Sequence, residues 1–165
     1  MAKKFLIFGG LYLLLASIAV GFFILTGKLT TQHAILDPLN IAEGKIIYEQ
    51  NCASCHGIDL KGQPNWETKR VDGTFPPPPQ NEDGHTWQHS DRQIYSYIEE
   101  GGAYFSPPPF KSNMPGYKEI LTSKQIWNLI TYIKSRWPEE IRKRQTAANF
   151  AGGFGHHENL LEYHI

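Results

Sequence analysis

Apolar residues recur three and four positions apart in three stretches of the chain, at residues 40–51, 91–100 and 123–136. That spacing places them on one face of an α-helix. Each stretch begins with, or directly follows, a residue that can cap a helix, and a Glu or Gln three positions after that residue completes a capping box. The pattern therefore predicts three amphipathic helices. The capping pairs are Asn40 with Glu43, Ser90 with Gln93, and Thr122 with Gln125.

A different hydrophobic pattern precedes these helices. Residues 5–27 carry no charge, and as a helix these 23 residues would span about 34 Å, enough for a hydrocarbon core of about 30 Å. Lys3 and Lys4 are expected to hold the N-terminus on the cytoplasmic side of a membrane. The alternative is a signal peptide cleaved near Ser17-Ile18-Ala19, but cleavage there would leave an apolar start on the mature chain. We therefore predict an uncleaved transmembrane anchor at residues 1–27 and a flexible linker at residues 28–39.

The only two cysteines of the chain lie at the end of the first predicted helix, in Cys52-Ala-Ser-Cys55-His56. C-x-x-C-H is a motif for covalent attachment of c-type haem. Two thiols at this spacing can form thioethers with the vinyl groups of a porphyrin, and the imidazole that follows becomes an axial ligand of the iron. The alternatives are a redox dithiol, which should lie in a βαβ pattern that the sequence lacks, and a zinc site, which would need a distant fourth ligand.

Met114 is the only methionine apart from Met1 and is the candidate for the second axial ligand. The proline that follows disfavours a helical conformation at Met114, so its thioether is expected on an extended loop. Fifty-eight residues separate it from His56, enough chain to reach the opposite face of a haem. A methionine that only fills a gap in the core is the alternative role. His85 or His89 would be the competing ligand, although both are expected to be exposed.

Together, C-x-x-C-H and the later Met-Pro, just before a C-terminal helix, resemble the class I monohaem cytochromes c over roughly residues 38–138. The resemblance implies an all-α fold of about three to five helices around one haem c, here in a domain at residues 40–138. It also implies that the pair Leu129 and Tyr132 crosses the first helix at Gly44 and Tyr48. One carbonyl among Pro76 to Pro79 is expected to accept the ring N–H of His56, although these prolines would also suit a surface for partner docking.

Two further regions are read from residues alone. Trp87 is expected either to line the haem, donating its indole N–H to a propionate, or to be an ordinary core residue. Residues 139–165 form a C-terminal extension in which Arg142-Lys143-Arg144 reads as a solvated helix end. The rest of that extension is expected either to dock on a partner subunit or to be disordered.

Composition adds one exclusion. The chain has 16 basic and 16 acidic residues, so there is no basic excess to indicate nucleic-acid binding. With the N-terminal lysines removed, the rest is slightly acidic.

Bis-ligated haem iron passes electrons and has no open position for oxygen, so the expected function is one-electron carriage rather than enzyme catalysis. The resemblance implies partners in a membrane electron-transport chain: a quinol-oxidising complex as donor, and a terminal oxidase or photosynthetic reaction centre as acceptor. The haem domain is expected on the periplasmic or extracellular side of the inner membrane, as a tethered shuttle or a bound subunit. The alternatives are an electron-accepting subunit of a periplasmic dehydrogenase and a haem sensor with a labile Met114.

Overall fold

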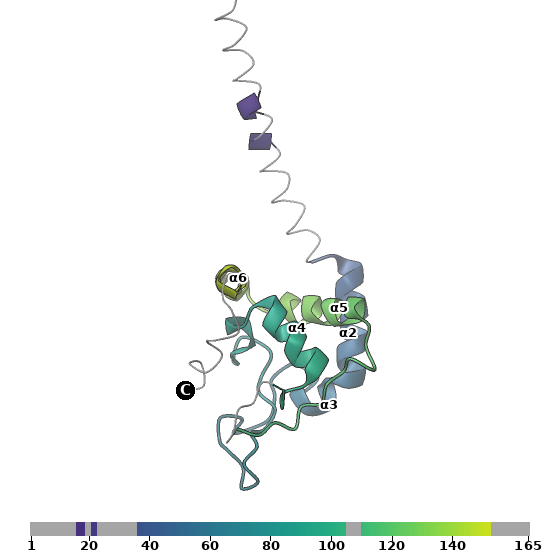
Figure 1. Cartoon of the computed structure of the whole chain (residues 1–165), viewed down its shortest axis with the longest axis vertical. Coiled ribbons are helices and arrows are strands. Elements are labelled where there is room, and N and C mark those ends of the chain that lie inside the picture. The colour runs from purple at the N-terminus through teal and green to yellow at the C-terminus, as the bar shows by residue number, and fades with distance from the viewer. Residues whose placement is uncertain (1–15, 19–20, 23–35, 105–109, 153–165) are drawn as a thin grey trace, which may run out of the picture. The chain divides into compact units, whose positions relative to one another are not determined.

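Figure 1 shows a computed structural model of the chain, in which residues 16–18, 21–22, 36–104 and 110–152 are described. The chain divides into two units, Met1–Asp37 and Pro38–Ile165. The first unit contributes short helical segments at residues 16–18 and 21–22. Most of the predicted anchor and linker thus lies outside the described residues. Within the part that is described, no helix has the length and apolar character needed to cross a membrane.

The second unit is helical, as predicted. Its described residues form no strand, only an isolated bridge between Thr74 and Lys111. The all-α fold class is therefore confirmed. The elements are α2 (Pro38–Asn51), α3 (Ala53–His56), the 3₁₀-helix η1 (Thr86–Gln88), α4 (Asp91–Glu100), α5 (Ser123–Ser135) and α6 (Glu139–Gly152).

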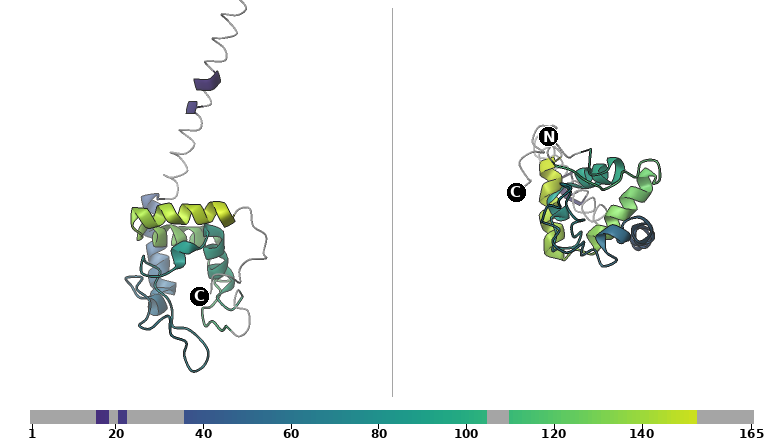
Figure 2. Two further views of the ribbon diagram at one scale, coloured as in Figure 1. Left: turned by 90° about the vertical axis from the view of Figure 1, so that its left-hand side faces the viewer. Right: turned by 90° about the horizontal axis from the view of Figure 1, so that it is seen from below.

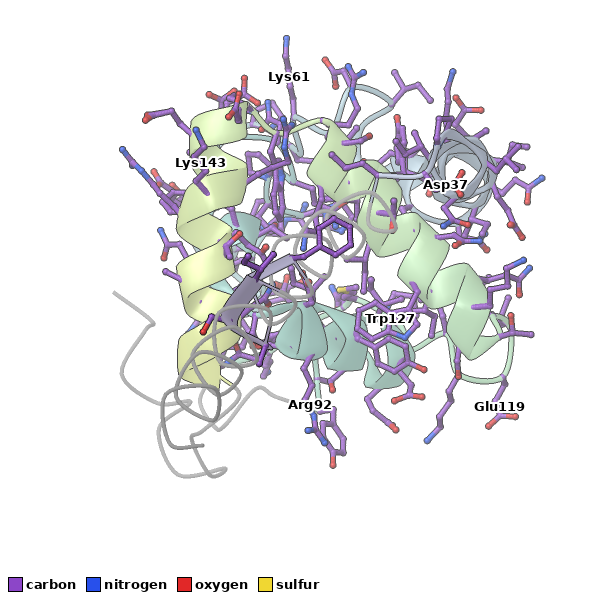
Figure 3. All side chains as sticks on the ribbon, turned by 90° about the horizontal axis from the view of Figure 1, so that it is seen from above. Asp37, Lys61, Arg92, Glu119, Trp127 and Lys143 are labelled. Atoms are coloured by element: carbon purple, nitrogen blue, oxygen red, sulfur yellow. The ribbon has the colours of Figure 1, made fainter. Side chains whose placement is uncertain are left out.

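The central contact of this unit is the crossing of α2 and α5, which Figure 3 shows with α2 nearly end-on near Asp37. A Cβ atom on Gly44 would lie 2.0 Å from the Asn128 carbonyl oxygen and 2.9 Å from Cβ of Tyr132. Only glycine permits this approach. The Tyr48 and Tyr132 rings then meet at 5.4 Å between centroids. The predicted crossing at Gly44 and Tyr48 is therefore confirmed. Tyr48 and Tyr132 at this crossing also belong to the apolar core. The buried apolar residues are Ile47, Tyr48, Leu60, Ile94, Ile98, Leu121, Ile126, Leu129, Ile130, Tyr132, Ile133 and Trp137.

The helix starts are determined locally in two of three cases. Helices α4 and α5 begin at the predicted residues, and both capping boxes form, through Ser90 and Thr122. The prediction for α2 was wrong: the helix begins at Pro38, so Asn40 lies inside its first turn. Proline is well suited to a first turn, where its missing N–H costs nothing. Glu43 instead accepts a hydrogen bond from Asn128 of α5, at 2.7 Å.

Helix α6 was not predicted as a packed element, yet it lies against η1 and α4 (Figure 2). The hydrogen bonds of this contact centre on Asp91, the first residue of α4, and Ile141 of α6 adds an apolar contact with the core. The Asp91 carboxylate accepts from Lys134 of α5 at 2.6 Å, from Gln145 at 2.7 Å and from Asn149 at 3.0 Å. Lys134 and Gln145 are both buried. Residues 153–165, where docking or disorder was predicted, lie outside the described residues.

Candidate functional site

The Cys52–His56 segment follows α2 with almost no interruption. The backbone N–H of Cys52 donates to the Tyr48 carbonyl at 2.8 Å, which continues the hydrogen-bond pattern of α2. The next turn is α3, in which the N–H of His56 donates to the Cys52 carbonyl at 2.9 Å. Cys52 is half-buried and Cys55 is exposed, and both are free thiols. One helical turn therefore presents two thiols and an imidazole in a fixed order.

The described surroundings of the two cysteines favour neither a redox dithiol nor a zinc site. Burial, with a smaller contribution from the nearby Cys55, raises the pKa of Cys52 to about 12. A thiol with a raised pKa is mainly protonated at neutral pH and is therefore a poor nucleophile for dithiol exchange. Among the described residues, no group of three or more His, Cys, Asp and Glu side chains is arranged to hold a metal ion.

His56 is the one buried member of the motif, with 8% of its surface exposed. Its Nδ1 lies 2.9 Å from the carbonyl oxygen of Pro78. Burial lowers the pKa of His56, and the Pro78 bond opposes this only in part. The imidazole is therefore neutral, and a neutral imidazole that donates through Nδ1 presents the lone pair of Nε2 to a metal.

The proline segment that supplies this carbonyl is held by the loop after His56. Gln63 N–H donates to the Pro77 carbonyl at 3.0 Å, and Gln80 N–H donates to the Leu60 carbonyl at 2.8 Å. Gly62 allows the two chains to touch, because a Cβ there would lie 2.5 Å from Pro78 backbone carbon. Pro78 is therefore the proline whose carbonyl meets His56, and partner docking at these prolines stays a prediction.

Met114 lies on a loop, as predicted, and it is half-buried against the apolar core. The loop is fastened to the end of α4: Gly102 N–H donates to the Met114 carbonyl at 3.1 Å, and Tyr117 N–H donates to the Ile98 carbonyl at 3.0 Å. A Cβ on Gly101 would lie 2.9 Å from the Met114 carbonyl oxygen and 2.7 Å from the Gly116 nitrogen. The glycines at the end of α4 thus do more than stop the helix, because they let the Met114 loop lie against it.

Two tyrosines connect the pieces of the site, and sequence reasoning did not assign them this role. Tyr117 donates its hydroxyl to the Asn51 carbonyl at 2.7 Å, which joins the Met114 loop to the residue before Cys52. Tyr48 donates to the Gly57 carbonyl at 2.8 Å, directly after His56. Burial raises the pKa of both hydroxyls. The position of Tyr117, three residues after Met114, was the feature of the sequence that could have indicated this role.

The segment around Trp87 differs from expectation. The indole N–H of Trp87 donates to the Gly84 carbonyl at 2.8 Å, so the proposed donation to a propionate was wrong. His85 and His89 are half-buried rather than exposed. Their rings lie 5.5 Å apart, His85 stacks on Trp66, and His89 lies against Tyr97.

The residues present fit a covalently attached haem. Two free thiols at C-x-x-C spacing precede a buried, neutral and oriented imidazole, and a thioether is held on a fastened loop against the same core.

Comparison with known proteins agrees with this fit. The family model described as Cytochrome c matches residues 41–137, which is more than half of the chain. No curated protein and no solved structure matches the chain.

Proposed function

The chain belongs to the cytochrome c family, and we propose that its haem iron is held between His56 and Met114. As a member of this family the protein carries one covalently attached haem c and is an electron carrier rather than an enzyme. Cys52 and Cys55 fit the attachment motif, and we assign the two thioether bonds to them. Haem, when bound, supplies an iron that takes up and releases one electron.

The observation that carries the ligand assignment is the bond from His56 Nδ1 to the Pro78 carbonyl, 2.9 Å long and shielded from water by the burial of the ring. This bond fixes the tautomer, orients the ring and raises the basicity of Nε2. Free histidines rotate and change tautomer. His56 is instead prepared in the form in which imidazole binds iron.

Met114 is the second ligand in this proposal. Four backbone hydrogen bonds hold its loop to the C-terminal end of α4 and the turn after it: from Gly102 to Met114, from Tyr117 to Ile98 and to Glu99, and from Lys118 to Glu99. A ligand on so well fastened a loop needs little rearrangement when the iron changes oxidation state. Methionine ligation raises the haem potential, so the protein is proposed as a high-potential carrier.

The ligand assignment is tested by Met114→Ala, with His85→Ala and His89→Ala as controls. In Met114→Ala we expect loss of the methionine–iron(III) charge-transfer band, a lower potential, and binding of carbon monoxide to the reduced protein. The two histidine variants should keep the wild-type spectrum. If a histidine variant loses sixth-ligand signals while Met114→Ala retains them, then Met114 is not the ligand.

We further propose that residues 1–27 anchor the protein in the inner membrane, with the haem domain on the periplasmic or extracellular side. There it would carry electrons from a quinol-oxidising complex to a terminal oxidase or reaction centre. The uncharged run at residues 5–27 supports the anchor. A tether of this kind maintains a high effective concentration near membrane partners.

Gentle solubilisation followed by identification of the co-purifying subunits tests these partners. A periplasmic dehydrogenase in their place would contradict them. A chain lacking residues 1–27 should leave the membrane fraction when the haem domain is otherwise intact.

A further inference from the structure

Trp137, directly after α5, makes a contact that no part of the proposed function yet explains. The side chain is 1% exposed, and its indole N–H donates to the backbone carbonyl of Gln80 at 2.7 Å. A buried indole N–H must find an acceptor, and here the acceptor lies 57 residues away along the chain. The bond therefore joins the C-terminal end of the domain to the proline segment.

Gln80 lies two residues after Pro78, whose carbonyl orients His56. From the other side, Gln80 N–H donates to the Leu60 carbonyl at 2.8 Å. The peptide groups of Gln80 are thus held by Trp137 through the oxygen and by Leu60 through the nitrogen. Because Pro79 fixes its own φ, the chain between Pro78 and Gln80 has few rotations with which to absorb a shift. A displacement at Gln80 is therefore passed on to the Pro78 carbonyl.

Trp137 is itself held in place. Its backbone N–H donates to the Lys134 carbonyl at 3.2 Å, and Arg142 of α6 donates to the Trp137 carbonyl. The junction between α5 and α6 thereby fixes the indole.

We propose that Trp137 is a positioning residue for the axial histidine: through Gln80 it holds the Pro78 carbonyl where it accepts the Nδ1 proton of His56. This inference rests on the proposed function of His56 as an iron ligand. A carbonyl in this position makes the imidazole a stronger electron donor to the iron, which favours the ferric state. Without the indole N–H, the Pro78 carbonyl is held less firmly, and its hydrogen bond with His56 weakens. The imidazole then donates less electron density to the iron, so the midpoint potential of the haem rises.

The test compares Trp137→Phe with Trp127→Phe in the full-length haem-loaded protein. Trp127 is the matched control because it lies on α5 but is 45% exposed, against the ring of Tyr95 (Figure 3). In Trp137→Phe we expect the ferrous-to-ferric ratio at the wild-type midpoint to rise about twofold. That is about 18 mV, at about 59 mV per tenfold for one electron. We also expect the Nδ1 proton of His56 to exchange with solvent about tenfold faster in the reduced protein. Trp127→Phe should change neither quantity.

A wild-type potential together with wild-type exchange of the Nδ1 proton in folded Trp137→Phe would overturn the proposal. If Trp137→Phe does not fold, 3-benzothienylalanine at position 137 keeps the bicyclic shape and removes only the donor, and the same two measurements decide. The spectrum of the wild-type protein distinguishes a failure of the Trp137 proposal from a failure of the proposed ligand assignment. A wild type without histidine–methionine ligation refutes the ligand assignment, whereas a normal wild type with an unresponsive variant refutes only the role of Trp137.

Discussion

Gly101→Ala should displace the Met114 loop, and the structure allows the size of the effect to be worked out. Gly101 has φ +86° and ψ 162°, a region that only glycine occupies readily. An alanine there costs about 1–3 kcal/mol in backbone strain. In addition, its Cβ would lie 2.7 Å from the Gly116 nitrogen and 2.9 Å from the Met114 oxygen. These are backbone atoms that cannot rotate away, so the loop must move at a further cost of about 1–3 kcal/mol.

Gly73→Ala is the matched control for Gly101→Ala. Gly73 has a similar φ of +88°, but the nearest atom to its added Cβ would be Cδ of the flexible Lys111 side chain, at 3.5 Å. Gly73→Ala therefore carries the strain without the clash. We expect Gly101→Ala to lower the free energy of unfolding by about 2–6 kcal/mol, and Gly73→Ala by about 1–3 kcal/mol.

Denaturant unfolding of the haem-loaded proteins measures both losses, at an unchanged slope against denaturant. Absorption spectra report the site: Gly101→Ala should weaken the methionine–iron band, and Gly73→Ala should keep it. Equal destabilisation of the two variants, or an unchanged band in Gly101→Ala, would refute the idea that contact with α4 positions the loop.

The remaining predictions concern the polar contacts of the fold. Asp91→Asn should destabilise the protein by about 3–5 kcal/mol, because it leaves the buried Lys134 without its charge partner. Lys143→Ala breaks only the exposed pair with Glu139, so the same thermal or denaturant assay should give the wild-type stability. Burial raises the pKa of Tyr48 and Tyr117, so the folded state keeps phenolic protons that the unfolded chain releases near pH 10. The free energy of unfolding should thus fall with rising pH above about pH 10, and Tyr48→Phe or Tyr117→Phe should make that fall shallower. An unchanged slope in both variants would contradict this assignment.

The chemistry of the site was readable from the sequence because it depends on residues close together in the chain. The spacing of Cys52, Cys55 and His56 is fixed by one helical turn, whatever the rest of the protein does. The proline after Met114 acts on its immediate neighbour, so the loop was predicted as well. Capping boxes close within four residues, which is why α4 and α5 begin where expected.

The failures occurred where a residue has several partners within reach. Glu43 was predicted to complete the capping box of α2, but its carboxylate accepts a hydrogen bond from Asn128 of α5 instead. Trp87 was a plausible donor to a propionate, but the Gly84 carbonyl lay three residues away. Helix α6 has a weakly amphipathic sequence, and apart from Ile141 it is joined to the domain by polar side chains that hydrophobic periodicity does not reveal.

The sequence by itself therefore determined the cofactor, the candidate ligands and the helical class, since each follows from short-range spacing and covalent chemistry. Only the tertiary structure decided which of four identical prolines serves His56, because that depends on how Gly62 and Leu60 fit against the segment. It also decided that Asp91 holds α6 and that Trp137 reaches Gln80. Those contacts join residues more than fifty positions apart, and packing of the whole domain, rather than local preference, selects among partners at such separations.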